Sequence, residues 1–164
     1  MAQHRQVWRH IVAGGMGESS GRIHRQNGAE LLEAMQEGGL EVRAEWIERG
    51  EGTFEFGREA ASRLLGLPAS ERPTAIVALN DTQAIGALHA ARELGLEVGR
   101  DIAIIGFDDA PMSQYLFPSL TTVRQPIHEA GRECVEILVA LMQGNQPLKR
   151  NVLLQPELIL RDSA

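Results

Sequence analysis

The chain has 164 residues, 43% of them hydrophobic and 23% charged, with a formal net charge of −6 at pH 7. This length allows one domain with a buried core, and the negative charge argues against these residues gripping nucleic acid, because phosphate binding needs clustered Lys and Arg. No apolar run approaches the roughly 18 residues of a membrane span and no apolar signal core begins the chain, so we expect a cytoplasmic chain with no membrane partner.

Cysteine and histidine usage predicts neither a disulfide nor a metal site. Cys134 is the only cysteine, and its apolar surroundings, CVEILVALM, predict a buried, inert thiol. The five histidines show no H-E-x-x-H pattern and no i, i+4 pair. We therefore expect no metal and no cofactor.

Strand-like and helix-like segments alternate along most of the chain. Strands are predicted where short apolar or alternating runs occur, at residues 7–13, 40–46, 74–79 and 101–107. Helices are predicted where apolar side chains recur at helical spacing, at residues 20–37, 54–65, 81–94 and 127–142. This alternation implies right-handed crossovers, so the predicted fold class is α/β, a Rossmann-like parallel sheet with helices on both faces. The alternation lapses after about Leu120, where extended segments flank the last long helix.

Polar side chains directly follow the predicted strands. Asn80-Asp81 and Asp108-Asp109 each come after an apolar strand, and Arg25 lies in the first turns of the helix after the first strand. Ligands of open parallel sheets bind at the carboxyl ends of the strands, so we expect these side chains on one edge. Arg can fork onto carboxylates or vicinal hydroxyls, Asn donates and accepts, and Asp accepts from hydroxyls or amines. The set predicts recognition of a small polar, sugar-like or nucleobase-like molecule.

Each of these groups also has a purely structural interpretation. Asn80 or Asp81 can cap the helix that follows them. The pair Asp108-Asp109 is also consistent with a solvated turn, and Arg25 with an exposed charge on a helix. These alternatives stay open at the level of the sequence.

A serine-hydrolase interpretation rests on the G-x-S-x-G stretch that contains Ser19. The order Ser19, Asp108 or Asp109, His128 matches the chain order of α/β-hydrolases. Against it, loop residues separate the serine from the preceding strand, and His128 begins a long helix rather than lying in a loop after a strand. We therefore predict no catalytic residue and no enzyme activity.

Three motifs follow one another over residues 72–126: P-T-A-I-x-x-x-N-D-x-x-A-x-G, then G-L-x-V-x-x-D-I-x-I-x-G-F-D-D, then P-x-L-T-T-V-R-Q-P. In order and spacing they resemble the effector-binding domain of LacI/GalR (lactose-repressor-type) transcription regulators, and weaker likeness extends over nearly all 164 residues. The resemblance implies one lobe of a periplasmic-binding-protein-like fold that binds a small effector, such as a sugar. It also implies a homodimer that reads operator DNA through a helix-turn-helix absent from these residues. A sugar-binding protein of a transporter is the main alternative.

The resemblance implies roles for individual residues around the ligand. Arg25, Asn80 and Asp108 stand at the family's ligand contacts, and Asp81 and Asp109 are expected to brace them.

Two further roles follow from the same resemblance. Gly52 stands where many family members carry an aromatic that stacks on the effector, so nearby Phe54 is expected to support the site instead. The implied dimer contacts are Ile85, Leu88, Tyr115 and Leu116, although Ile85 is also consistent with a core residue.

The resemblance also divides the chain. It assigns residues 1–120 to the C-terminal effector-binding lobe, residues 121–148 to a crossing segment and helix of the other lobe, and residues 149–164 to returning strands. Within these 164 residues the crossing helix has no second lobe to join. We therefore expect it to pack on its own sheet, to swap between chains, or to be poorly ordered.

Overall fold

A computed structural model describes residues 11–13, 33–40, 43–146 and 151–164 of the chain. Its centre is a five-stranded sheet with the strand order β1-β2-β3-β4-β5. The strands are β1 (Ile11–Ala13), β2 (Ala75–Val77), β3 (Ala103–Asp108), β4 (Thr121–Arg124) and β5 (Glu157–Ile159). The first four strands pair in parallel, and β5 pairs antiparallel with β4. The predicted α/β class and parallel sheet are confirmed, with β5 making the sheet mixed.

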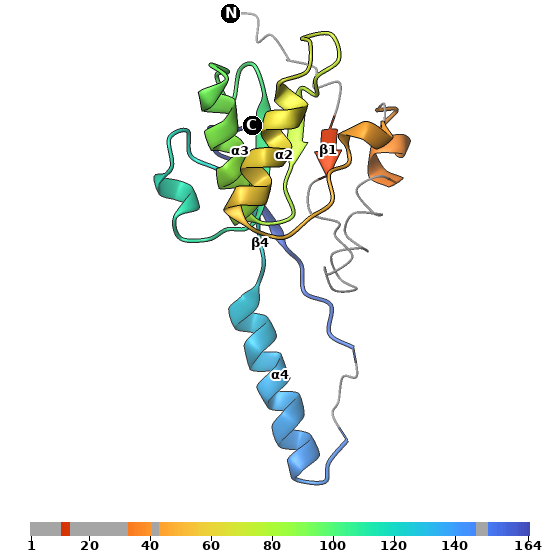
Figure 1. Cartoon of the computed structure of the whole chain (residues 1–164). Helices are drawn as coiled ribbons and strands as arrows, with labels where there is room; N and C mark the ends of the chain where they lie inside the picture. Colours follow the sequence, from red (N-terminus) through yellow and green to blue (C-terminus); the bar gives the residue numbers. More distant parts are fainter. Residues whose placement is uncertain (1–10, 14–32, 41–42, 147–150) are drawn as a thin grey trace, which may run out of the picture.

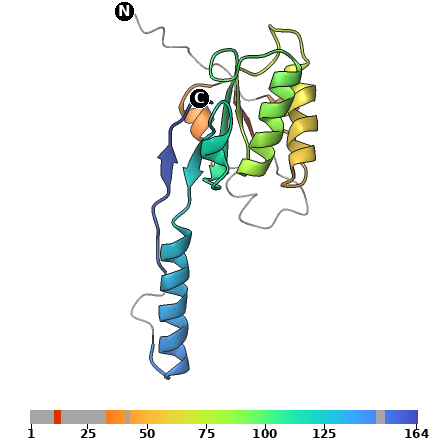
Figure 2. The same cartoon turned by 90° about the vertical axis from the view of Figure 1, so that its left-hand side faces the viewer.

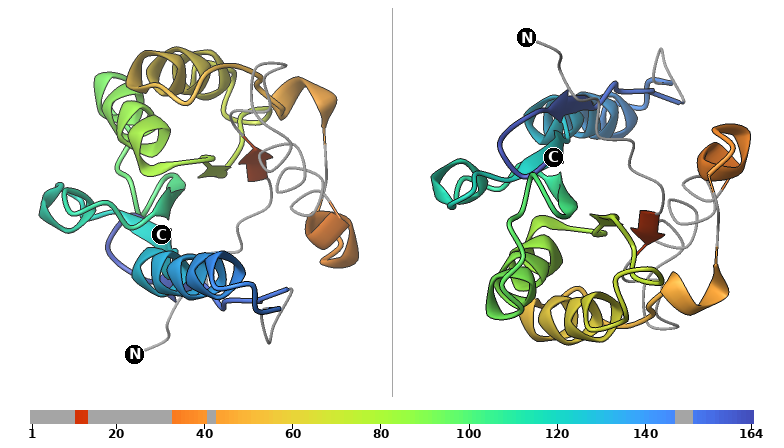
Figure 3. Two further views of the ribbon diagram at one scale, coloured as in Figure 1. Left: turned by 90° about the horizontal axis from the view of Figure 1, so that it is seen from below. Right: turned by 90° about the horizontal axis from the view of Figure 1, so that it is seen from above.

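Two helices cover one face of this sheet. They are α2 (Phe54–Leu65) and α3 (Asp81–Glu93), and they lie side by side on the same side of the strands (Figures 1 and 3). Thr53 begins α2 by accepting a hydrogen bond from the Phe56 backbone N–H at 3.2 Å. The core between helices and sheet is built from Leu, Ile and many Ala side chains, including Leu64, Ile76, Ala84, Ala87, Ala91, Ile104 and Leu120.

The stretch 40–46, predicted as a strand, folds differently. Its residues Ala44–Trp46 form a 3₁₀ turn, η1. Trp46 is only 1% exposed, and its indole Nε1 donates to the Glu71 carbonyl at 3.2 Å. The Arg43 guanidinium stacks 4.6 Å from the centre of the Trp46 ring. The alternating pattern of the sequence does not distinguish this turn, which carries one large buried side chain, from a strand.

Helix α4 (Ile127–Met142) projects away from the sheet (Figures 1 and 2). None of its residues is buried, so of the three expected arrangements the packing of this helix on its own sheet is not observed. Cys134 is exposed, which corrects the predicted buried thiol. The apolar pattern of this helix marks a face with no covering element among the described residues. Its exposed apolar side chains are Ile127, Val135, Leu138, Val139, Leu141 and Met142.

The chain returns from α4 as an extended segment that ends in β5 (Figure 1). Because β4 runs parallel to β2 and β3, α4 leaves from the same edge of the sheet at which β2 and β3 end. A 3₁₀ turn, η2 (Ser113–Tyr115), lies in the loop between β3 and β4. The carboxyl edge of the sheet and the base of α4 are therefore neighbours.

Candidate functional site

Polar side chains stand next to one another at the carboxyl ends of β2, β3 and β4, an edge called the rim below. Asp108 pairs with Arg124 across β3 and β4. Asn80 lies between the end of β2 and the start of α3, and Asp108 is the last residue of β3, the strand that pairs with β2. Two of the three predicted ligand contacts thus lie at the carboxyl ends of adjacent strands.

Asn80 uses its carboxamide in two directions. Its Oδ1 accepts from the Gln83 backbone N–H at 2.8 Å, so Asn80 does cap α3. Its Nδ2 donates to the Gly52 carbonyl at 3.1 Å. A Cβ at Gly52 would lie 2.7 Å from that nitrogen. Glycine at this position lets the 51–53 loop approach Asn80, and an aromatic side chain there would push the loop away.

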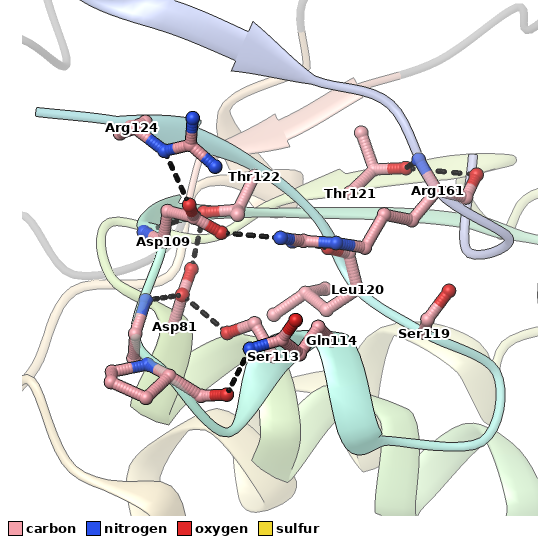
Figure 4. A network of polar contacts seen from close by, with 12 residues as sticks. Asp81, Asp109, Ser113, Gln114, Ser119, Leu120, Thr121, Thr122, Arg124 and Arg161 are labelled. Atoms are coloured by element: carbon pink, nitrogen blue, oxygen red, sulfur yellow. Dashed lines mark hydrogen bonds and ion pairs between the residues drawn. The ribbon is translucent and has the colours of Figure 1, made fainter.

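Asp81 is buried beneath the rim, with only 1% of its surface exposed. One carboxylate oxygen accepts from the Ala110 backbone N–H at 2.7 Å and from the Ser113 hydroxyl at 2.5 Å. The other accepts from the Thr122 hydroxyl at 2.5 Å (Figure 4). A Cβ at Gly106 would lie 2.2 Å from this carboxylate, so β3 needs glycine there. Asp81 thereby ties the start of α3 to the loop after β3 and to β4.

The backbone turns sharply where β3 ends. Asp108 has φ 128° and Asp109 has φ 55°, both in a region that residues other than glycine rarely adopt. Aspartate tolerates such conformations better than most residues, but each costs about 1–3 kcal/mol and persists only where the surroundings hold it. Backbone strain of this kind concentrates at functional sites.

Asp109 is held by two arginines (Figure 4). Its Oδ1 lies 2.6 Å from Arg161 Nη2, and its Oδ2 lies 2.7 Å from Arg124 Nε. Burial on its own raises the pKa of Asp109, but hydrogen bonds from Arg161 and Arg124 outweigh it and bring the pKa below its usual range. The bond to Asp109 in turn raises the pKa of Arg124. Asp109 is therefore a firmly ionised anchor at the rim.

Several residues of this network were not singled out from the sequence. Arg161 also donates through Nη1 to the Leu120 carbonyl at 2.6 Å, which fixes the loop that enters β4. Gln125 Nε2 donates to Asp108 Oδ1 at 2.6 Å. Arg124 Nη1 also lies 3.3 Å from Glu157 Oε2. Arg124 and Gln125 belong to the T-T-V-R-Q-P motif, which gave them no role, whereas Glu157 and Arg161 lie outside that motif.

The other predicted site residues either lie outside the described residues or lie at other places in the fold. Arg25 and Ser19 lie outside the described residues. The ring of Phe54 packs edge-on against His89, with 5.8 Å between ring centres. His128 is exposed on α4. The acid that a hydrolase would need is already engaged, Asp108 by Gln125 and Asp109 by two arginines.

The implied dimer contacts occupy one region beside α3 and η2. Tyr115 and its neighbour Phe117 are 76% and 88% exposed, which is unusual for aromatic side chains. Ile85, Leu88 and Leu116 are half-buried. Leu88 and Phe117 line a surface pocket of about 420 Å³. The other residues that line it are Arg92, Leu96, Glu97, Val98, Pro118 and Asp162.

Two other kinds of site are absent from the described part of the chain. No group of three or more His, Cys, Asp or Glu side chains there could hold a metal ion. None of the helices described is both long and apolar enough to cross a membrane.

Similar proteins place this geometry in a family. Residues 4–164 match the model of the periplasmic binding protein-like domain. The chain is 41% identical over 132 residues to the HTH-type transcriptional repressor CytR of Escherichia coli K12, which is 80% of this chain and 38% of that protein. A regulatory protein of the LacI family from Chloroflexus aggregans superimposes with a TM-score of 0.90 at 54% identity, over 95% of this chain and 55% of that one. The transcriptional regulator CelR in complex with cellobiose gives a TM-score of 0.86 at 26% identity, over 96% and 47%.

The fold and the rim thus define a periplasmic-binding-protein-like α/β domain. Within that class the chain belongs to the LacI family of transcription regulators, whose effector domain it overlaps, as the sequence motifs implied. It spans about two fifths of the curated relatives and about half of the solved structures that it matches. Relatives of this kind are regulators rather than enzymes.

Proposed function

We propose that this chain is the effector-binding region of a LacI/GalR-type transcription regulator. It binds a small polar molecule at the rim and carries out no chemistry on it. The observation that carries this proposal is that Asn80 and Asp108 lie at the carboxyl ends of two adjacent parallel strands, where ligands of such sheets bind. Arg25, which follows β1 in the sequence, is the third proposed contact.

The chemistry of the rim suits a ligand rich in hydroxyl groups. Asp108 accepts from hydroxyl or amine hydrogens, and Asn80 keeps a second amide hydrogen beyond the one given to Gly52. Asp81 and Asp109 hold both groups in place without facing the ligand themselves. Two structural neighbours carry sugar derivatives, namely CelR with cellobiose and the Lac repressor with ONPG. We therefore assign a sugar or sugar-like effector.

In the proposed mechanism the effector acts through differential affinity. A ligand that binds one arrangement of the lobes better than the other shifts the whole protein between states with high and low affinity for DNA. Operator DNA is bound through a helix-turn-helix outside these residues, and the protein works in the cytoplasm. The net charge of −6 supports the proposal that these residues bind the effector and that a separate helix-turn-helix binds DNA, since a negatively charged chain is poorly suited to contact DNA.

The lobes follow the family path in this proposal. Residues 1–120 form the C-terminal lobe, residues 121–148 cross to the other lobe, and residues 149–164 return. The exposed apolar side chains of α4 support a crossing helix that belongs against another lobe. The contrast with α2 and α3, whose apolar faces are buried, supports the same division.

The proposal also includes a homodimer. Its interface is the face formed by Ile85, Leu88, Tyr115 and Leu116. Exposed aromatic side chains in a loop are costly in water unless a partner covers them, and Tyr115 with Phe117 supplies two of them.

Isothermal titration calorimetry on the whole regulator tests the effector site. The probes are cellobiose, ONPG, and a panel of neutral sugars and nucleosides. At least one probe is expected to bind, and Asn80→Ala or Asp108→Ala weakens that binding at least about tenfold, because each removes a direct hydrogen bond in a desolvated site. Asp101→Ala is the matched control, since it changes the same residue type at the opposite end of β3. Unchanged affinity in both rim variants would sink the assignment.

A further inference from the structure

Gln83 carries an amide side chain that is buried in the first turns of α3, with only 2% of the residue exposed. Both ends of this amide bond to backbone groups. Its Oε1 accepts from the Leu79 N–H at 3.1 Å, and its Nε2 donates to the Glu51 carbonyl at 2.7 Å. One buried side chain thus joins the segment that follows β2 to the loop that precedes α2.

The surroundings of this amide are mostly apolar. Gln83 lines a small cavity together with side chains of α2, β2 and α3, among them Leu64, Ile76 and Ala87. An amide in such a place is costly unless its hydrogen bonds are made, because no bulk water replaces a missing partner. The bonds of Gln83 are therefore a condition of its burial, and one of them holds the 51–53 loop against α3.

The backbone of Gln83 is also fixed, because it lies in a close contact between α2 and α3. A Cβ at Gly57 of α2 would lie 2.2 Å from the Gln83 carbonyl oxygen, and a Cβ at Gly86 of α3 would lie 2.2 Å from the Phe54 carbonyl oxygen. The two helices thus touch through their backbones near their starts. The amide of Gln83 extends to the loop from a backbone that has little room to move.

The loop that Gln83 holds is the loop that Asn80 contacts. Asn80 Nδ2 donates to the Gly52 carbonyl at 3.1 Å, and this carbonyl follows directly after the one that Gln83 binds. Asn80 Oδ1 accepts from the backbone N–H of Gln83 at 2.8 Å. The Asn80 carboxamide therefore depends on Gln83 twice, once through that N–H and once through the position of the loop.

This dependence matters because a carboxamide has two unlike ends. Turning the Asn80 side chain over exchanges its amino group, which donates, and its oxygen, which accepts. The Gly52 carbonyl can pair only with the amino group, and the Gln83 N–H only with the oxygen. With both partners in place a single orientation is favoured, and a ligand meets the same donor and acceptor pattern each time.

From these contacts we propose that Gln83 is a positioning residue of the effector site, which holds the 51–53 loop against Asn80 and so fixes the hydrogen-bonding groups that Asn80 offers to the ligand. The inference rests on the proposed effector site and adds a residue to it. Gln83 is buried, so it acts through the loop and through Asn80 and needs no ligand contact of its own.

Calorimetry on the whole regulator, with the probes named above, tests this role. Gln83→Met keeps the length of the side chain but removes the amide, and it is expected to weaken binding about fivefold, as for one hydrogen bond that is no longer well oriented. Gln114→Met is the matched control. It makes the same change in a glutamine whose Nε2 also donates to a backbone carbonyl, that of Pro111, but at an exposed position. Its affinity is expected to stay within twofold of wild type.

A double-mutant cycle separates positioning from a general loss of structure. In an Asn80→Ala background, Gln83→Met is expected to change affinity less than twofold, because the carboxamide that it orients is gone. A purely structural role predicts the same loss in both backgrounds, and that result would overturn the inference. Wild-type affinity in Gln83→Met would overturn it as well.

Two NMR measurements need no ligand. The side-chain amide resonances of Asn80 are expected to shift in Gln83→Met, since the loop carbonyl that pairs with them is released. In the wild-type protein, which avoids any failure of a variant to fold, the side-chain amide hydrogens of Gln83 are expected to exchange with water more slowly than those of exposed Gln114. Unshifted Asn80 resonances or equal exchange rates would refute the role of Gln83. If no probe binds the wild-type protein, the proposed function falls, whereas these two measurements still decide whether Gln83 orients Asn80.

Discussion

The carboxylate of Asp81 lies 2.5 Å from the hydroxyl of Thr122, although the two residues are 41 positions apart in the chain. Asp81 belongs to the first turn of α3, and Thr122 belongs to β4. Strand β3 lies between α3 and β4. The contact is possible because Gly106 of β3 has no side chain in the way. Asn80 directly precedes Asp81, and Asp108 ends the strand that carries Gly106, so the positions of these two proposed ligand contacts depend on this buried contact.

The first prediction concerns Asp81 itself. Asp81→Ala removes the acceptor of three buried or half-buried donors and is expected to lower the free energy of unfolding by about 3 kcal/mol or more. Urea denaturation measures the loss. Thr82→Ala, at the exposed next position of the same helix, is the control and is expected to change stability by about 0.5 kcal/mol at most. A loss in Asp81→Ala no larger than the control's would contradict the bracing role.

A second prediction compares two glycines. Gly106→Ala places a Cβ 2.2 Å from Asp81 Oδ1 and 3.0 Å from Leu120 Cδ2, so the variant must push a buried contact apart and is expected to be destabilised by about 1–3 kcal/mol. Gly131→Ala in α4 meets nothing within 4 Å, and the higher helix propensity of Ala is expected to stabilise α4 by up to about 1 kcal/mol. Urea denaturation reports the first effect and far-UV circular dichroism with heating reports the second. The same sign for both variants would show that the space around Gly106 is not limiting.

The sequence predicted those elements whose cause is local. The bounds of α2 and α4 agree with the predicted helices 54–65 and 127–142. Such helices can be predicted because the spacing of apolar residues and the helix caps depend only on residues that are close in the sequence. The predicted strand at 40–46 was wrong because its conformation follows the burial of Trp46 against Glu71, 25 residues away. The spacing of apolar residues in 127–142 correctly predicted the helix α4, but it did not predict where that helix lies. The spacing shows that one face of the helix is apolar, and it does not show which element covers that face.

The candidate site also contains some residues whose positions the sequence predicted and others whose contacts it did not predict. The positions of Asn80 and Asp108 at the carboxyl ends of strands could be predicted, because a polar residue after an apolar strand has a known place in a parallel sheet. Their supports were not found as a network, because Arg161 reaches Asp109 across 52 positions and Ser113 reaches Asp81 across 32. Contacts at such separations depend on which strands become neighbours, and nothing local in a single sequence encodes them.

A third prediction follows from the lowered pKa of Asp109. Because the pKa in the folded state lies below the unfolded value of about 3.9, the ionised form stabilises the fold. That stabilisation is complete above the unfolded pKa and is lost as pH falls through the folded pKa. Urea denaturation between pH 5 and pH 3 is therefore expected to show a steeper loss of stability for wild type than for Asp109→Asn. Thr82→Ala, an exposed substitution that removes no titratable group, should keep the wild-type slope, and parallel slopes for all three proteins would refute the role of Asp109.

The last prediction concerns the proposed dimer face. Phe117 and Tyr115 present large apolar surfaces to solvent, at 88% and 76% exposure, and aromatic side chains of this kind supply much of the energy at interfaces where they are buried. The paired change Tyr115→Ser and Phe117→Ser is expected to raise the dimer dissociation constant at least about thirtyfold, which corresponds to about 2 kcal/mol. Sedimentation velocity over a concentration series measures it. Leu153→Ser is the matched control, because Leu153 is also 86% exposed but lies in the extended segment after α4. If the aromatic variant dimerises as tightly as wild type while the control weakens the dimer, the interface lies along the crossing segment and not beside η2.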